Sequence, residues 1–284
     1  MEKNKSVKRM DWRQKVLISI LGSFIVILSI LFCITYHYFV KKIETGNEKV
    51  VLMTFEQAEK NLKNVLENAE LCLNKYVTND LIWDYKNDYP ETDVESNKLK
   101  VRITDSFIDE MAVNRELSAL GFLRGDGRGI VSSAFRKNRT GNTEISGKLL
   151  EALRQSKNAY PYTTWLPGWE LSLNSESPLR LMNQNASLIG IKALGESSEL
   201  EKDGYLIVAV SESDIQNTYR SVAFDDSTAV LVDGNNQIIS NVGGNLLGEQ
   251  LEPGNDTQNI EYALDIYDWK LCDMIPKQEY MKDA

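Results

Sequence analysis

The sequence predicts an α+β fold in which a single transmembrane helix leads into a long stalk helix and two antiparallel-sheet modules. Three observations favour this fold class. Residues 16–40 form an uninterrupted apolar run, residues 51–76 space apolar side chains as a helix does, and residues 117–275 alternate short apolar runs with turn residues. These patterns are typical of membrane helices, long packed helices and β-hairpins, respectively.

The segment from Val16 to Val40 has the composition of a membrane helix. It contains no Asp, Glu, Lys or Arg, and about 20 apolar residues suffice to cross a bilayer. A cleaved signal peptide is the alternative, but its apolar core would span about 7–15 residues and end in small residues. This run instead ends in the aromatic-rich stretch 36–39. We therefore expect an uncleaved anchor at residues 16–40.

The charges on the two sides of the anchor predict its orientation. Residues 1–15 carry six Lys or Arg against two acidic residues, a net charge of +4. Because positive flanks stay inside the cell, we expect a single-pass protein of the cell membrane with residues 1–15 cytoplasmic and residues 41–284 extracellular. The latter region has 26 Lys and Arg against 39 Asp and Glu, a net charge of −13. Such a charge disfavours a nucleic-acid partner.

Composition excludes several kinds of chemistry. The only histidine of the chain, His37, lies inside the anchor, so residues 41–284 have no Ser-His-Asp or Cys-His site and no His-ligated metal site. Phosphate-binding and hydrolase glycine motifs are absent, and Asp126 and the pair Asp225–Asp226 lack the spacing of an EF-hand. We predict no catalytic residue, no metal and no cofactor. An extracellular hydrolase with paired carboxylates is the least favoured function.

Residues 41–80 are predicted to form the stalk helix. Apolar residues follow a 4-3 spacing that is typical of a heptad seam, namely Val51, Phe55, Ala58, Leu62, Val65, Ala69, Cys72 and Tyr76. This seam is suited to pairing with a second copy in a homodimer, or to packing on the modules that follow. Cys72 and Cys272 are 200 positions apart. They are compatible with a disulfide, although two buried core residues are the preferred interpretation.

The rest of the chain is predicted to form two modules, at residues 81–215 and 216–284. A helix is expected at 104–115 before the first module's sheet, a second at 146–155 and a third at 213–222. Hairpins and strands are expected at 117–123, 130–135, 187–194, 205–211, 229–232, 237–240, 259–266 and 269–275, with Gly-rich turns between several of them.

Three segments carry a resemblance to a known family: Gly204 to Ile215, Val230 to Ser240, and Tyr262 to Pro276. Their order resembles the double Cache (dCache, PAS-like) extracytoplasmic sensor domains of bacterial transmembrane receptors of the sensor histidine kinase type. The resemblance covers about residues 16–281. It implies two PAS-like modules, a small-molecule ligand in the membrane-distal module, and signal transduction in a two-component system. The family continues into a second membrane helix and an output domain, which this sequence lacks.

The candidate ligand site lies in the distal module. The aromatic stretch 160–169 joins two of its elements and suits both recognition and packing, Arg124 is suited to an anionic group, and an acid and an aromatic open the strand at 205–211. The predicted ligand-binding residues are Tyr160, Tyr162, Trp165, Trp169, Arg124, Asp203 and Tyr205. For Trp165, a core role is the alternative. The family's amino-acid motif is absent, since Ala209 stands at its downstream Asp position.

Two functions follow from these expectations. The first is the ligand-sensing region of a receptor, homodimeric through its stalk, in which ligand binding shifts a conformational equilibrium. The alternative is a membrane-tethered binding or adaptor protein that works with a separate receptor. The identity of the ligand, the type of output and the choice between a truncated receptor and a complete adaptor stay open at this point.

Overall fold

The computed structural model describes residues 12–87, 94–134, 137–171, 176–183, 186–195, 203–223, 227–251 and 257–276. Outside these ranges lie residues 1–11, which are predicted to be cytoplasmic, residues 88–93 and 196–202, the pair Asp225–Asp226 and the end of the chain. The chain divides into two compact units, Met1–Met53 and Thr54–Ala284.

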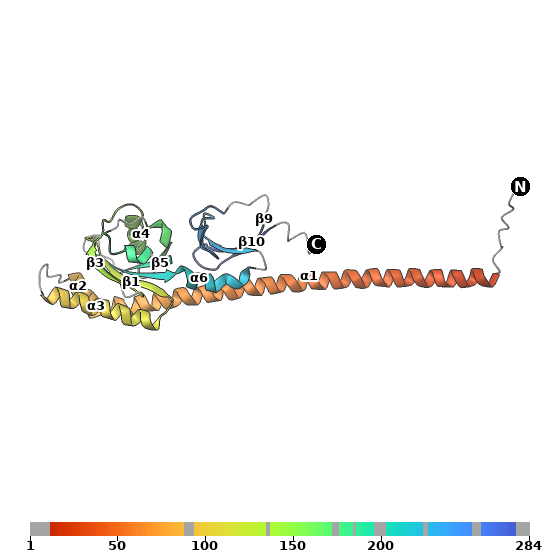
Figure 1. Cartoon of the computed structure of the whole chain (residues 1–284), viewed down its shortest axis with the longest axis horizontal. Helices are drawn as coiled ribbons and strands as arrows, with labels where there is room; N and C mark the ends of the chain where they lie inside the picture. Colours follow the sequence, from red (N-terminus) through yellow and green to blue (C-terminus); the bar gives the residue numbers. More distant parts are fainter. Residues whose placement is uncertain are drawn as a thin grey trace. The chain divides into compact units, whose positions relative to one another are not determined.

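The first unit consists mainly of the N-terminal part of helix α1 (Trp12–Val77), which extends from one unit into the other (Figure 1). Within the described residues, Ile20–Tyr38 is the one helical segment that is long and apolar enough to cross a membrane, and none of it is buried. The predicted apolar N-terminal helix is therefore confirmed as a possible membrane span.

The second unit contains the remaining helices and both sheets. Its helices are α2 (Asp80–Asn87), α3 (Val94–Val113), α4 (Gly147–Asn158), α5 (Arg180–Asn183) and α6 (Glu212–Tyr219), with short 3₁₀ turns η1 (Gly168–Glu170) and η3 (Arg220–Val222). Helix α6 starts where a capping serine predicts it: the Ser211 hydroxyl accepts a hydrogen bond from the Asp214 amide at 3.1 Å. Helix α3 begins ten residues before the helix predicted at 104–115, so it is longer than predicted.

The first sheet has six antiparallel strands in the order β3-β2-β1-β6-β5-β4. Its strands are β1 (Leu117–Arg124), β2 (Arg128–Ser133), β3 (Asn138–Asn142), β4 (Thr164–Pro167), β5 (Ala186–Ala193) and β6 (Gly204–Ser211). The predicted hairpin at residues 117–135 is formed by β1 and β2. Its turn requires Gly127, whose φ is 91° and where a Cβ atom would lie 2.3 Å from the Thr143 carbonyl oxygen.

The second sheet has four antiparallel strands in the order β8-β7-β10-β9. Its strands are β7 (Thr228–Val232), β8 (Ile238–Asn241), β9 (Thr257–Ala263) and β10 (Lys270–Pro276). Both predicted hairpins of this part are present, and β10 pairs with β7 across the middle of the sheet. The α+β class with two antiparallel sheets is thus confirmed.

Two edge strands of the larger sheet were not predicted, β3 and β4. All five residues of β3 are exposed, so no apolar alternation marks it, and β4 ends in Pro167 within a Pro- and aromatic-rich stretch. An edge strand needs backbone pairing on one side only, which tolerates both a polar composition and a proline. Local sequence patterns therefore carry little signal for either strand.

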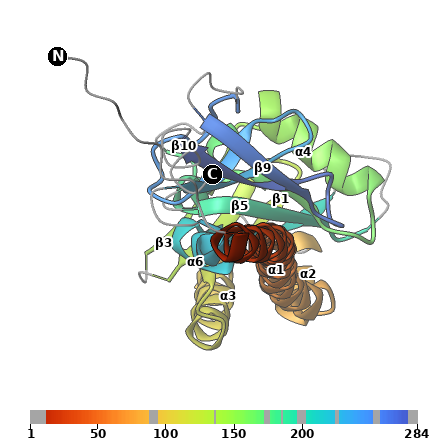
Figure 2. The same ribbon diagram turned by 90° about the vertical axis from the view of Figure 1, so that its right-hand side faces the viewer.

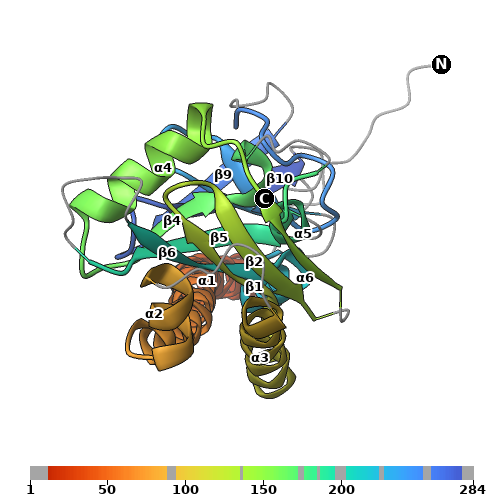
Figure 3. The ribbon, with the colours of Figure 1, turned by 90° about the vertical axis from the view of Figure 1, so that its left-hand side faces the viewer.

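The six-stranded sheet is covered on both faces (Figure 3). Helices α4 and α5 cover one face, where a large apolar cluster includes Leu153, Met182 and Ile207. Helices α1, α2 and α3 cover the other face, with edge-on ring contacts from Tyr76 to Phe107 and from Tyr85 to Phe122. Viewed along α1, α6 lies beside it (Figure 2). We call the two faces of this sheet the α4 face and the α1 face.

Candidate ligand-binding site

Two of the predicted site residues, Trp165 and Tyr205, lie on opposite faces of the six-stranded sheet. Across the sheet, Trp165 is directly opposite Gly190, which is opposite Val208, so these three side-chain positions share one face. Tyr205 is an odd number of positions from Val208 and belongs to the apolar cluster of the α4 face. Because successive side chains of a strand point to opposite faces, Trp165 and Tyr205 do not face the same pocket.

On the α4 face, Asp203 and Tyr205 form a polar group with Lys157, which was not among the predicted site residues. The Lys157 ammonium, at the end of α4, lies 2.6 Å from an Asp203 carboxylate oxygen. Asp203 is 4% exposed and Tyr205 is fully buried, and burial together with the Asp203 carboxylate raises the pKa of Tyr205 above its usual value. Tyr160 packs against the same apolar cluster. Three predicted residues therefore gather around one ion pair.

On the α1 face, Trp165 is part of a different group. Its ring lies against Gly190, where a Cβ atom would come within 3.0 Å of it. Tyr267, from the turn between β9 and β10, lies beside Trp165 and Glu70 of α1, and burial and the Glu70 carboxylate raise the pKa of Tyr267 to about 12. Burial lowers the pKa of Lys192, which donates a hydrogen bond to the Pro161 carbonyl. Tyr267 thus links the hairpin of the smaller sheet to Trp165 on the larger sheet and to Glu70 of α1.

Arg124 and Tyr162 lie apart from both groups. The Arg124 guanidinium donates to the Tyr85 carbonyl oxygen at 3.2 Å and pairs with the Asp126 carboxylate at 3.2 Å, so it is engaged in holding α2 and the hairpin turn. Tyr162 is 74% exposed. A ligand contact by Arg124 would compete with these interactions, whereas Tyr162 is open to solvent.

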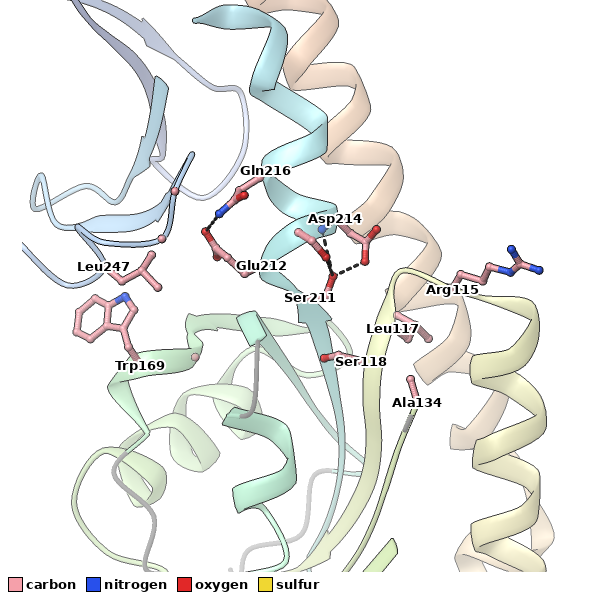
Figure 4. Close-up of a pocket in the computed structure, with 14 residues that line it drawn as sticks. Arg115, Leu117, Ser118, Ala134, Trp169, Ser211, Glu212, Asp214, Gln216 and Leu247 are labelled. Atoms are coloured by element: carbon pink, nitrogen blue, oxygen red, sulfur yellow. Dashed lines mark hydrogen bonds between the residues drawn. The ribbon is translucent and has the colours of Figure 1, made fainter. Parts of the chain in front are cut away.

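Trp169 lines a cleft between the two sheets (Figure 4). The cleft has a volume of about 860 Å³ and is bounded by η1, the start of β1, the N-terminal turn of α6 and the loop after β8. The Trp169 ring lies against Gly248, where a Cβ atom would come within 3.4 Å of it. The Trp169 indole nitrogen is buried and has no hydrogen-bond partner among the described residues.

Glu212 supplies the acidic wall of this cleft. One carboxylate oxygen accepts hydrogen bonds from the Gln216 amide at 2.9 Å and the Ser240 hydroxyl at 2.7 Å. The second oxygen is buried and has no partner in the described part of the chain. The Ser240 hydroxyl also lies 2.6 Å from the Tyr219 hydroxyl, whose pKa is raised above its usual value by burial. This chain of polar groups connects α6 to β8.

No local sequence pattern indicates that Lys157 contacts Asp203 or that Glu212 contacts Ser240. Lys157 and Asp203 are 46 positions apart, and Glu212 and Ser240 are 28 positions apart. Ser211 followed by Asp214 marks the start of α6, and this places Glu212 in a first helical turn. Its contact with the second sheet depends on packing between distant segments, which no local pattern encodes.

Comparison with known proteins shows the fold. No protein-family model and no curated protein matches the chain. Among solved structures, the extracellular domain of the histidine kinase soHK1S-Z6 is similar with a TM-score of 0.57 and 9% identity, covering 86% of this chain and 98% of that one. The extracellular domain of the histidine kinase rpHK1S-Z16 is similar with a TM-score of 0.55 and 9% identity, covering 85% of this chain and 99% of that one.

The sensor domain of the V. cholerae histidine kinase DctB is also similar, with a TM-score of 0.51 and 8% identity, covering 81% of this chain and 96% of that one. This chain therefore has the fold of extracellular sensor domains of histidine kinases. The resemblance to double Cache sensor domains is confirmed at the level of the fold. The similar structures are sensor domains and not catalytic ones, which fits a non-enzymatic region.

Proposed function

We propose that this chain is the extracytoplasmic ligand-sensing region of a bacterial membrane receptor, anchored through Ile20–Tyr38. The observation that carries the proposal is the sensor-domain fold, with two antiparallel sheets on a helix that also contains the apolar segment. Residues 1–15 would be cytoplasmic and residues 41–284 extracellular, and the kinase or other output would belong to a different part of the system.

We place the ligand in the membrane-distal module, at the six-stranded sheet. The partly buried Lys157–Asp203 pair, in which Asp203 is buried and Lys157 is 19% exposed, supports this location on the α4 face together with Tyr205. A buried ion pair in an apolar setting costs desolvation energy, and a ligand with a charged group is suited to replace one of its members. Tyr160 would form the apolar wall. Arg124, Tyr162, Trp165 and Trp169, which lie elsewhere, would act by shaping or coupling the site.

The stalk is proposed to be the dimer element and the route of the signal. Its seam from Phe55 to Tyr76 is buried against the chain's own modules, so pairing between copies would use other positions. Val50 and Leu52 are exposed just before the buried part of the seam. A ligand that favours one packing of the modules on α1 would shift the population of stalk conformations.

The proposal is tested with a thermal-shift screen of the full chain in lipid nanodiscs against amino acids, organic acids, amines and sugars. We expect one class to raise the melting temperature, because a ligand that binds only the folded state stabilises it. Asp203→Asn should abolish the shift, while Arg154→Gln, an exposed change on helix α4, which also carries Lys157, should preserve it. The proposed site is wrong if Asp203→Asn folds and keeps the full shift.

The alternative function is a membrane-tethered adaptor that presents its ligand to a separate receptor. The same fold and anchor support it, and both functions share the ligand site. Co-purification after cross-linking in the native membrane separates the two: a receptor polypeptide that bridges to residues 41–284 favours the adaptor, and self-crosslinking through the stalk favours the homodimeric sensor.

A further inference from the structure

We propose that the cleft between the two sheets is a second binding site, and that it takes a small organic cation with an ammonium group and an apolar body. The cleft is separate from the Lys157–Asp203 group, and it is bounded by elements of both sheets and by α6 (Figure 4). Glu212 would hold the ammonium group and Trp169 would contact the apolar body.

The first argument is the pair of unsatisfied polar atoms at the cleft. The second carboxylate oxygen of Glu212 and the indole nitrogen of Trp169 are both buried without a hydrogen-bond partner among the described residues. Burying a polar group without a partner is unfavourable, and more so for a charged one. A bound group that donates to Glu212 removes the larger of these penalties.

The second argument is charge. The cleft contains the carboxylates of Glu212 and Asp214, and its one basic residue, Arg115, is exposed and directed away from Glu212 (Figure 4). The net charge of −13 on residues 41–284 attracts cations over a longer range. An anionic ligand would be repelled by these carboxylates, and a neutral ligand could hydrogen-bond to Glu212 but would leave its charge unbalanced.

The third argument separates an organic cation from a metal ion. Within the described part of the chain, no group of three or more His, Cys, Asp or Glu side chains is placed to hold a metal. One Asp214 oxygen already accepts from the Ser211 hydroxyl, and one Glu212 oxygen is occupied by two donors. The remaining carboxylate oxygens of Glu212 and Asp214 suit one ammonium group but fall short of the six to eight oxygen ligands of calcium.

The fourth argument is the apolar lining. Leu117 and Leu247 line the cleft with the Trp169 ring. Cations are attracted to the face of an indole ring, and ammonium ligands are often recognised in this way. A compound that contacts Trp169 and Glu212 on one side and Leu247 on the other would bridge the two modules, so its binding would favour this arrangement of the modules over others.

The probe we choose is phenethylammonium, with phenethyl alcohol as the neutral analogue and phenylacetate as the anionic one. Isothermal titration calorimetry on the full chain in nanodiscs should detect phenethylammonium, with at least about tenfold weaker binding of both analogues. The hydroxyl of phenethyl alcohol can donate a hydrogen bond to Glu212 but carries no positive charge, and phenylacetate has no donor and is repelled by the carboxylate. Equal binding of the neutral analogue, or no binding of the cation, would overturn the proposal and leave a cleft that holds only water.

Variants locate the site. Glu212→Gln keeps the size of the side chain and one acceptor oxygen for Gln216 and Ser240, but it replaces the second oxygen by an NH2 donor and removes the charge. It should weaken phenethylammonium binding at least about tenfold. Glu249→Gln, which changes an exposed acid on the neighbouring loop, is the matched control and should leave the affinity for phenethylammonium unchanged. Asp203→Asn should also leave this affinity unchanged, so the calorimetric test of the cleft is independent of the proposed ligand site at Lys157 and Asp203. A folded Glu212→Gln protein with unaltered affinity contradicts the assignment.

Discussion

Asp273 is the most deeply buried acid of the four-stranded sheet. Its side chain is fully buried on β10, one carboxylate oxygen accepts a hydrogen bond from the Ser227 hydroxyl at 2.5 Å, and the other has no partner among the described residues. Burial raises the pKa of Asp273 above its ordinary value of 3.8, and the Ser227 hydrogen bond partly offsets this. The carboxylate therefore opposes folding once it is ionised.

We predict that Asp273→Asn stabilises the protein at neutral pH. Because the folded-state pKa exceeds the unfolded-state pKa, the native state binds more protons between the two values, so the free energy of unfolding falls as pH rises through that interval and stays lower above it. The gain should be about 1.4 kcal/mol for each unit by which the pKa is raised. Urea unfolding at pH 7 measures it.

The same substitution should have little effect at about pH 3, below the ordinary pKa of 3.8, because the carboxyl group is then protonated in both states. Asp105→Asn, an exposed change on α3, is the control and should be neutral at both pH values. A loss of stability of Asp273→Asn at pH 7 would mean that the ionised carboxylate has a favourable partner, contrary to this account.

At the scale of elements, α1 shows how a helix pattern is modified by its surroundings. The predicted 4-3 seam is buried from Phe55 onward, but Leu66 and Leu73 are also buried, while Val65 is only partly so. A seam that faces a single partner helix is narrow, whereas a helix that packs on a domain buries a wider stripe. Packing on the chain's own modules, one of the two expected uses of the seam, accounts for the broader face.

Glu59 connects α1 to the hairpin of β9 and β10. One carboxylate oxygen accepts from the Asp265 amide at 2.6 Å and the other from the Tyr262 hydroxyl at 3.0 Å, and the Tyr262 ring stacks on Phe55 with 5.4 Å between centroids. Burial and the Glu59 carboxylate raise the pKa of Tyr262 to about 12. This contact is a direct route by which the smaller sheet can act on the stalk.

We predict that Glu59→Ala loosens the hairpin from α1. Two hydrogen bonds to a charged, partly exposed group are lost, so the free energy of unfolding should fall by about 1–3 kcal/mol, and the Asp265 amide should exchange faster with deuterium. Glu56→Ala, one helical turn away and exposed, should change neither quantity. Unaltered exchange at Asp265 in Glu59→Ala would show that the hairpin is held by packing alone.

At the scale of the whole molecule, the proposed topology is open to a labelling test. Cys72 and Cys272 are free and buried, and burial raises the pKa of both thiols to about 12, so they react poorly with maleimides. This agrees with their interpretation as core residues. A Cys33→Ser background therefore leaves no reactive thiol in the described part of the chain.

In that background, Ser213→Cys introduces a thiol at an exposed position in the first turn of α6. A membrane-impermeant maleimide should label it in right-side-out membranes without permeabilisation. Ser6→Cys should be labelled only after permeabilisation, because the net charge of +4 on residues 1–15 predicts a cytoplasmic N-terminus. The reverse pattern would mean that the orientation is opposite to the one proposed.

The sequence by itself determined the features that depend on neighbouring residues. The apolar run at Ile20–Tyr38, the β1–β2 hairpin with its Gly127 turn and the closing hairpin of β9 and β10 were all visible in local patterns, because side-chain periodicity and turn chemistry act over a few positions. The absence of histidine after the anchor excluded whole classes of chemistry in the same direct way.

The tertiary structure alone decided which candidate residues share a site. Tyr205 and Trp165 were both predicted ligand contacts, yet strand register places them on opposite faces of one sheet. The pairing of Lys157 with Asp203, and of Glu212 with Ser240, joins segments that are far apart in the chain. Such contacts follow from how complete elements pack against one another, and a one-position change of register would redirect every side chain of a strand.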